Sequence, residues 1–552
     1  MRIVIVGGVA GGMSAAARAR RLNEQAEIIV LDKGADVSFA NCGLPYHVSG
    51  DIGSREALLL HTPASLRSTL NLDVRVRTEV TAIDRAARTV TARGPEGEYR
   101  LAYDALVLAP GASAAVPPIP GVDLPYVTHL RTVDDATALA ERAQHARSAV
   151  VMGAGFIGLE TAEALRTRGL DVTVVEMAPQ VLPPLAPELA HLVEAELVAN
   201  GVTVHTGVAA TAITPHRADA ALVTLSNGTA VPADIVVVSV GVRPNSALAL
   251  DAGLSVDERG AIVVDAEQRT SDPHIWAVGD AIAVPHAITG ATAPVPLAGP
   301  ANRQGRRAAE SIMGVATAAR PVLGTAIVRV FGLTAALTGA SPRMLDAAGI
   351  DYVEHHTHHL NHAGYFPGAQ HMHLLATFSP DGRLLGAQGV GRDGVDKRID
   401  VLATALRAGF GADDIAELEL AYAPPYGSAK DPVNMLGFMM QNELAGTLTT
   451  WGAGDVEWAR ANALILDVRS PAEYARGHVP EAINVPHTEV RARLDEIRAA
   501  AAGRPVRVHC ASGFRSYLAH RILDQNGFDS ANFDGGMLTM QAALPNLPLA
   551  TR

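Results

Sequence analysis

The sequence predicts an α/β protein of several domains, and three observations lead to this fold class. Short apolar runs such as "RIVIV", "EIIVLD" and "SAVVMG" are rich in β-branched residues and alternate with helical patterns, as buried parallel strands do. The order strand, glycine turn, helix, strand occurs twice, at about residues 1–35 and 147–177. The chain has 552 residues, enough for roughly three to five folding units.

Composition and charge exclude several classes of function. The net charge of −12 argues against general nucleic-acid binding, which needs a basic face to displace phosphate counterions. No apolar run reaches transmembrane length, so we expect no membrane insertion. The opening "MRIVIVGGVAGG" continues into a helix and a second strand, and we therefore do not interpret it as a signal peptide. Two cysteines form no disulfide framework, which favours the reducing cytoplasm.

The second strand–turn–helix unit carries a dinucleotide-binding loop. Gly153, Gly155 and Gly158 follow a strand and open a helix, in the spacing G-x-G-x-x-G. Such glycines allow a tight turn and let backbone N–H groups approach a pyrophosphate at the positive helix end. Glu176 ends the next strand, where a carboxylate binds a ribose 2′-hydroxyl and repels a 2′-phosphate. This unit is predicted to bind NADH in preference to NADPH.

The first unit carries a looser form of the same loop, "VGGVAGG". Its glycines are Gly7, Gly8, Gly11 and Gly12. Val9 stands at the middle glycine position, and Asp32 ends the following strand. Further along, "TSDPHIWAVGDA" resembles a flavoprotein signature in which a strand-end aspartate, here Asp280, contacts the ribityl or phosphate part of FAD. We therefore predict two Rossmann-like domains, with FAD at the first and NADH at the second.

The two glycine loops and the flavoprotein signature, in the order in which they occur, resemble the flavoprotein disulfide reductases with two dinucleotide-binding domains. The resemblance covers about residues 1–440. Most members pair two redox cysteines, whereas Cys42 in "VSFANCGLPY" has no cysteine near it. "FANCGLPY" and "YAPPYGSAKDPVNM" resemble the coenzyme A disulfide reductases, whose relatives include NADH oxidases and NADH peroxidases. The resemblance implies that NADH reduces the flavin, which passes two electrons to a sulfur bond at Cys42. A flavin and a helix terminus are expected to lower the pKa of this thiol.

The resemblance also assigns substrate-binding residues. Coenzyme A carries phosphates that need cations, and Arg21 matches the arginine that binds it in the family. Arg18 lies three residues earlier on the same helix face. Ser38 and Asn41 match the family's polar contacts beside the cysteine. A solvated basic helix face is the alternative interpretation of the two arginines.

Family members are homodimers in which tyrosines of the partner's third domain reach the reactive cysteine. Tyr365 in "HAGYFPGA" and Tyr422 in "YAPPY" match them, and Tyr426 is a second candidate for the latter position. Phenolic hydroxyls there would hydrogen-bond a departing thiolate. The nearby "EHHTHHLNHAG" has no accompanying cysteine or carboxylate pattern, so we predict a polar surface segment and no metal.

The last hundred residues resemble a rhodanese domain. The segments "LILDVRSPAEYARGHVPEAINVPH" and "VRVHCASGFRSYLAHRIL" carry the resemblance. The loop from Cys510 to Arg515 follows a strand and opens a helix, so its N–H groups and the helix dipole would stabilise a thiolate or persulfide. Arg515 would add a fixed positive charge, and Asp467 and Arg469 match the motif that supports the loop. Because the cysteine is present, we expect catalysis.

These interpretations divide the chain. The expected domains are an FAD-binding domain in two parts (1–115 and 241–320), an NAD-binding domain (116–240), an α+β dimerisation domain (321–445), a linker (446–456) and an α/β rhodanese domain (457–552).

Three functions remain open. In the leading hypothesis, Cys510 passes sulfane sulfur to coenzyme A or a related thiol, and Cys42 reduces the resulting persulfide, polysulfide or disulfide with NADH. In the second, Cys42 reduces oxygen or peroxide through a sulfenic acid. In the third, the rhodanese domain is a sulfur carrier or docking module.

Overall fold

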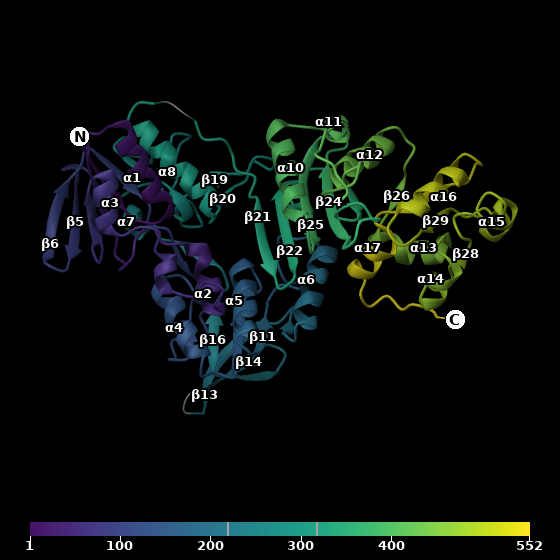
Figure 1. The fold of residues 1–552 in the computed structure, drawn as a ribbon, viewed down its shortest axis with the longest axis horizontal. Helices are drawn as coiled ribbons and strands as arrows, with labels where there is room; N and C mark the ends of the chain where they lie inside the picture. The colour runs from purple at the N-terminus through teal and green to yellow at the C-terminus, as the bar shows by residue number, and fades with distance from the viewer. Residues whose placement is uncertain (218–219, 316–317, 552) are drawn as a thin grey trace. The chain divides into compact units, whose positions relative to one another are not determined.

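The computed structural model describes residues 1–217, 220–315 and 318–551 (Figure 1). The chain forms two compact units. One consists of Met1–Pro179 and Val198–Gly324, and the other of Gln180–Leu197 and the residues from Thr325 onward. No helix among the described residues is long and apolar enough to cross a membrane.

The first sheet of unit one is parallel and has the strand order β18-β7-β1-β2-β3. Its strands are β1 (Arg2–Val6), β2 (Glu27–Leu31), β3 (Asp73–Arg75), β7 (Ala105–Leu108) and β18 (Ile275–Ala277). Helices α1 (Ala10–Leu22) and α8 (Ala298–Ile312) pack side by side (Figure 1). They approach so closely that a Cβ added to Gly305 would lie 2.0 Å from the carbonyl oxygen of Gly11. Gly305 therefore serves helix packing.

Smaller elements surround this sheet. They are the helices α2 (Leu44–Ser49), α3 (Pro63–Leu70) and α7 (Ala247–Asp251), the antiparallel strands β4 (Glu79–Asp84), β5 (Thr89–Gly94) and β6 (Gly97–Ala102), and the pairs β8 (Ala112–Ala114) with β17 (Val242–Pro244) and β19 (Ala283–Pro285) with β20 (Thr292–Pro294). Because β18 comes from residues far beyond β7, the first dinucleotide-binding domain is built from two separate stretches of chain.

The second sheet of unit one is also parallel and has the order β12-β11-β10-β16-β9. Its strands are β9 (Val127–Thr128), β10 (Ser148–Met152), β11 (Asp171–Val175), β12 (Thr203–His205) and β16 (Ile235–Val238). Its companions are α4 (Val133–Ala143), α5 (Phe156–Thr167) and the antiparallel strands β13 (Ala210–Arg217), β14 (Ala220–Leu225) and β15 (Ala230–Ala233). Two doubly wound domains thus stand in one unit, as the repeated pattern predicts.

Unit two begins with an antiparallel sheet of order β21-β22-β25-β24-β23. Its strands are β21 (Ala326–Val330), β22 (Leu333–Gly339), β23 (Val353–Thr357), β24 (Met372–Phe378) and β25 (Leu384–Gly391). The helices of this part are α6 (Pro187–Ala199), α9 (Pro342–Ala348), α10 (Val395–Ala408), α11 (Ala412–Ala416) and α12 (Pro432–Leu444). This part is the predicted α+β domain. It includes one helix, α6, from much earlier in the sequence.

The last domain has a parallel sheet of order β26-β30-β29-β27-β28. Its strands are β26 (Thr450–Trp451), β27 (Leu464–Asp467), β28 (Ile483–Asn484), β29 (Val506–His509) and β30 (Ser530–Phe533). Its helices are α13 (Val456–Asn462), α14 (Pro471–Arg476), α15 (Leu494–Ala501), α16 (Phe514–Asp524) and α17 (Gly536–Ala543). Trp451 is buried in this domain's core, so the stretch expected as a linker contributes an edge strand.

Candidate functional site

The two glycine loops share one backbone geometry although their sequences differ. Gly7 and Gly153 have φ values of +98° and +101°, in the region that glycine adopts without strain. A Cβ added to Gly12 would lie 1.8 Å from the carbonyl oxygen of Gly7, and one on Gly158 would lie 2.0 Å from that of Gly153. The first and last glycines of each loop are therefore required by the fold itself.

The middle position of the loop is under no such constraint. Gly155 has open space where a Cβ would stand, so the protein alone does not require a glycine there. Val9 takes the equivalent position in the first loop, at the start of α1. Neither α1 nor α5 has a side-chain cap, which leaves the N–H groups of both first turns able to bind a pyrophosphate. Each glycine loop and the helix start after it thus form a site for a pyrophosphate, which we call a cradle. Val9 departs from the glycine fingerprint without disturbing the first cradle.

A carboxylate accepts hydrogen bonds from the backbone of each glycine loop in the same way. Asp32 accepts a hydrogen bond from the N–H of Gly8, and Glu176 accepts one from the N–H of Ala154, both at 2.7 Å. Each carboxylate also accepts, at 2.7 Å, the N–H of the residue two positions further along. Both side chains are therefore held at strand ends beside the glycine loops, where a ribose hydroxyl would bind.

Cys42 lies beside the first cradle, in a short 3₁₀ turn (Asn41–Gly43) before α2. The segment is tied to the loop because the N–H of Ser38 donates to the carbonyl of Gly8 at 2.8 Å. Ser38 has a positive φ of +49°, an uncommon conformation for a residue other than glycine. Asn41 Oδ1 is buried with no hydrogen-bond partner among the described residues. The Cys42 thiol is free and exposed, so a ligand is able to approach it.

The protein's own groups, taken without a flavin, raise the pKa of Cys42. Burial, and then the carboxylates of Glu160 and Asp280, raise the pKa of this thiol, while Arg131 lowers it. Asp280 is itself paired with Arg131 at 2.8 Å. Helix α2 follows the cysteine but does not outweigh the two carboxylates. The protein's own groups thus favour the thiol, and the thiolate needs another source of stabilisation.

The two predicted coenzyme A arginines have different surroundings. Arg18 is partly buried and pairs with Glu310 of α8 at 2.7 Å, so its charge is already compensated. Arg21 is exposed. Of the two, Arg21 is the one whose cation is available to a phosphate.

Unit two brings the two predicted tyrosines together. The hydroxyls of Tyr365 and Tyr422 are 3.1 Å apart, and both side chains are largely exposed. Tyr426 is exposed as well and has no hydrogen bond to either of them. The paired phenols point to Tyr365 and Tyr422 as one unit.

The second cysteine sits in a closed cradle between β29 and α16. Cys510 is fully buried, and its sulfur accepts hydrogen bonds from the N–H of Gly513 and the hydroxyl of Ser516, both at 3.2 Å. Helix α16 has no side-chain cap. Donors converging on sulfur at a helix start favour the anion of a thiol or persulfide. Ser516 belongs to the quoted loop, but the sequence alone did not single it out.

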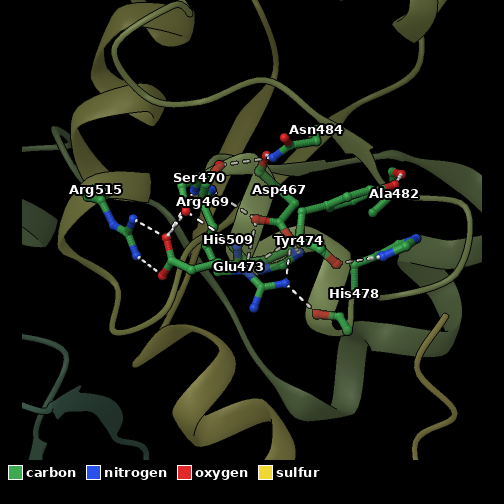
Figure 2. A network of polar contacts seen from close by, with 11 residues as sticks. Asp467, Arg469, Ser470, Glu473, Tyr474, His478, Ala482, Asn484, His509 and Arg515 are labelled. Atoms are coloured by element: carbon green, nitrogen blue, oxygen red, sulfur yellow. Dashed lines mark hydrogen bonds and ion pairs between the residues drawn. The ribbon is translucent and has the colours of Figure 1, made fainter. Parts of the chain in front are cut away.

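A buried ion pair forms the floor of this loop (Figure 2). Asp467, fully buried at the end of β27, binds Arg469 at 2.6 Å, and Arg469 also donates to the carbonyl of Gly477 at 2.7 Å. His509 lies 3.8 Å from Asp467, and burial lowers its pKa, so it is neutral at pH 7. Asp467 and Arg469, the pair predicted to support the loop, thus form a rigid base under His509, the residue before Cys510.

Arg515 is held in place by a carboxylate that was not predicted from the sequence. Figure 2 shows its guanidinium paired with Glu473, through two contacts of 2.8 and 2.7 Å. This pairing, more than burial, holds the pKa of Glu473 far below its usual range. Glu473 also caps α14 together with Ser470. Glu473 was not among the predicted residues, although the S-x-x-E spacing of a capping box marks it in the sequence.

A cavity lies beside α16, the helix that follows the Cys510 loop. Phe514 and Leu518, one turn apart on this helix, are both exposed. The cavity beside them has a volume of about 630 Å³. The cavity is lined by His487, Thr488, Arg491, Leu494, Leu518, Arg521, Ile522, Gln525 and Asn526. Arg521 pairs with Asp524 at 2.7 Å, so Arg491 is the lining cation that suits an anionic ligand with an apolar part.

Comparison with known proteins agrees with this geometry. Residues 1–305 match the model of the pyridine nucleotide-disulphide oxidoreductases. The chain belongs to this family. Residues 455–543 of this oxidoreductase match the rhodanese-like domain.

Two relatives of this oxidoreductase are each 35% identical to it. One is the coenzyme A disulfide reductase of Staphylococcus haemolyticus, aligned over 79% of this chain and 98% of the relative. The other is the NADH oxidase of Methanocaldococcus jannaschii, aligned over 79% of this chain and 97% of the relative.

Two solved structures cover almost the whole oxidoreductase. The reduced CoADR-RHD of Bacillus anthracis is 41% identical, with a TM-score of 0.96 over 99% of this chain and 98% of that one. The NAD-dependent persulfide reductase of A. fulgidus is 40% identical, with a TM-score of 0.92 over 98% of this chain and 100% of that one.

The family implies FAD and a nicotinamide nucleotide, and the two cradles of this oxidoreductase fit them. Each has an uncapped helix start, a glycine whose Cβ would clash, and a carboxylate held at the strand end. The unpartnered Asn41 Oδ1 beside Cys42 suits a ligand N–H or O–H.

Proposed function

We propose that this oxidoreductase uses NADH to reduce coenzyme A persulfide, polysulfide or coenzyme A disulfide at Cys42, and that Cys510 supplies sulfane sulfur to the acceptor thiol. One observation carries the proposal. The chain has two thiols, one exposed beside an FAD-type cradle and one enclosed by donors that favour a sulfur anion. Neither has a second protein thiol beside it, so each needs a substrate sulfur as its partner.

The sulfur-transfer steps balance without further reagents. The Cys510 thiolate attacks the sulfane sulfur of a donor, forms the persulfide Cys510–S–SH and releases the donor's thiolate. The thiolate of coenzyme A then attacks the outer sulfur, which gives coenzyme A persulfide and restores the Cys510 thiolate. In the enclosed cradle, Gly513 and Ser516 would hold the inner sulfur through both displacements.

At the first cradle, Cys42 would attack the persulfide at the coenzyme A sulfur. A mixed disulfide Cys42–S–S–CoA forms and hydrosulfide leaves. FAD and NADH, when bound, supply the two electrons that cleave this disulfide to Cys42 and coenzyme A. Gly7, Gly12 and Asp32 would hold FAD, while Gly153, Gly158 and Glu176 would hold NADH. The position of Glu176 favours NADH over NADPH.

Further parts of the assignment concern substrate, assembly and compartment. Arg21, Ser38 and Asn41 would bind coenzyme A, with Arg18 in a supporting role through Glu310. We expect a homodimer in which Tyr365 and Tyr422 of one subunit serve Cys42 of the other. Their exposed, hydrogen-bonded hydroxyls suit that role. Two free thiols that act as thiolates fit the cytoplasm.

A second candidate function is reduction of oxygen or peroxide, with Cys42 cycling through a sulfenic acid. The similarity to an archaeal NADH oxidase favours it. The attached rhodanese-like domain favours sulfur as the acceptor. A rhodanese domain that only carries sulfur or docks a partner would fit either reaction.

The test is NADH turnover by the wild type, Cys42→Ser and Cys510→Ser, each with coenzyme A persulfide, polysulfide, coenzyme A disulfide and peroxide. We expect Cys42→Ser to lose reduction of all sulfur substrates. Cys510→Ser should lose turnover with donors that need transfer, such as thiosulfate, and keep direct reduction of coenzyme A persulfide. If oxygen or peroxide is the fastest acceptor, the sulfur assignment is wrong.

A further inference from the structure

A buried ion pair joins the antiparallel domain to the rhodanese-like domain. His356 of β23 and Asp534, in the turn after β30, are separated by 178 residues in the sequence. The imidazole Nδ1 lies 2.5 Å from Asp534 Oδ2, and the backbone N–H of His356 donates to the same carboxylate at 2.9 Å. Both side chains are more than nine-tenths buried, and His355 and His358 are buried as well, so the prediction of a polar surface segment here is wrong. The interface between these two domains therefore contains a polar contact that water does not reach.

The turn that holds Asp534 also backs the Cys510 loop. The N–H of Met537 donates to the carbonyl of Cys510 at 2.8 Å. A Cβ added to Gly536 would lie 2.8 Å from that same carbonyl oxygen, so the two loops are in direct backbone contact. A shift of Asp534 would therefore move the backbone that carries the reactive sulfur.

The other side of the His356 ring meets a second carboxylate. Its Nε2 lies 2.7 Å from Glu188 of α6. Burial alone lowers the pKa of His356, but Asp534 and Glu188 together raise it well above its ordinary value. The pKa of Glu188 is lowered, because the contacts of His356 outweigh burial. At pH 7 an imidazolium thus stands between two carboxylates.

Other titratable groups surround this imidazolium. Burial raises the pKa of Glu354, on the same strand, to about 7, so it is largely neutral in mildly acidic solution. Burial lowers the pKa of His355 and His358, which stay neutral. Glu443 of α12 lies 3.4 Å from His355, and burial raises its pKa. Among these neighbours His356 is the group that supplies the positive charge.

We propose that His356 is a positioning residue for sulfur transfer, which holds the Asp534 turn and thereby the Cys510 loop in its reactive geometry. The inference rests on the proposed sulfurtransferase role of Cys510. It has a consequence for the route of sulfur. Because a buried ion pair fixes the rhodanese-like domain to the antiparallel domain, the domain does not swing to bring Cys510 to another site. A small diffusible thiol therefore carries the sulfur away from Cys510.

A second contact between the two domains allows the effect of His356 on the Cys510 loop to be separated from its effect on the docking of the domains. His358 Nε2 lies 2.7 Å from the hydroxyl of Thr539 on α17. This hydrogen bond joins the same two domains and does not involve the Asp534 turn. A His356 variant therefore keeps one polar contact across the interface.

The experiment compares His356→Gln and His356→Asn in the full-length enzyme. An asparagine amide reaches about as far as Nδ1 and keeps a donor toward Asp534. A glutamine amide reaches about as far as Nε2 and serves Glu188 instead. The readouts are kcat for thiosulfate:cyanide sulfur transfer against pH, NADH-dependent reduction of coenzyme A disulfide, and thermal unfolding. His145→Gln, an exposed histidine of unit one, is the matched control.

We expect His356→Gln to lower kcat for sulfur transfer about tenfold while reduction of coenzyme A disulfide stays within twofold of the wild type, since one lost charge-assisted hydrogen bond has this effect. His356→Asn should recover at least a third of the wild-type kcat. It should also lack the loss of activity that deprotonation of His356 causes in the wild type at alkaline pH.

Wild-type kcat in His356→Gln would overturn the inference. So would equal losses in both variants, which would show a requirement for the ring as packing alone. A wild type that transfers no sulfur from any donor would refute the proposed function of Cys510 instead, and the two failures are thereby distinguished.

Discussion

Removing one hydroxyl from the Cys510 cradle tests how the protein stabilises sulfur there. Ser516 is fully buried, and its single hydroxyl proton is shared between the Cys510 sulfur at 3.2 Å and the carbonyl oxygen of Gly513 at 3.0 Å. Ser516→Ala deletes this donor and leaves no unpaired group on residue 516 itself. A hydrogen bond to a charged group contributes about 1.5 to 3 kcal/mol. Because 3.2 Å to sulfur is a long contact, we take the lower figure of about 1.5 kcal/mol, which corresponds to roughly a tenfold loss of rate.

The chain's two cysteines make the assay specific. In a Cys42→Ser background Cys510 is the single thiol, so its alkylation by iodoacetamide and its single-turnover sulfur uptake from thiosulfate report on one site. We expect both rates to fall about tenfold in Ser516→Ala, the loss given by one charge-assisted hydrogen bond. Ser512→Ala in the same loop is the control, because this hydroxyl makes no hydrogen bond among the described residues. Rates of Ser516→Ala within twofold of that control would refute the reasoning.

Four further outcomes are expected. Glu176→Ala should lower the preference for NADH over NADPH about tenfold in kcat/KM, because the 2′-phosphate is no longer repelled; an unchanged ratio contradicts this role. Gly12→Ala should abolish FAD binding, read from flavin absorbance of the purified protein, whereas Gly158→Ala should keep FAD and lose NADH binding. Arg491→Gln should raise KM for coenzyme A as sulfur acceptor about fivefold and leave kcat with cyanide unchanged, because only the former is a large anion. The stability that His356 provides is fully present below its ordinary pKa of 6.5 and is lost as pH rises through its raised pKa, so the difference in Tm between wild type and His356→Asn should shrink toward pH 9; a difference that grows would contradict the charge assignment.

The parts of the fold and of the site that the sequence predicted are those formed by residues close together in the chain. Glycines at fixed intervals after a strand predict the two cradles, because the turn and the helix start are made by neighbouring residues. The same holds for the loop from Cys510 to Arg515, which is six residues long. The two lone thiols and the order of the domains also follow from sequence, and the family comparison agrees with that order.

The sequence determined these cradles and thiols, but only the tertiary structure decided their electrostatics. It pairs Arg515 with Glu473 and Arg18 with Glu310, so both expected cations have a carboxylate beside them that was not predicted from the sequence. It places Cys42 where burial and carboxylates raise its pKa, so a lowered value depends on the bound flavin. The physical reason is the same in each case. A charge acts over several ångströms in every direction, and its neighbours in space come from strands and helices that are remote in the chain. His356 and Asp534, 178 residues apart, show this most directly.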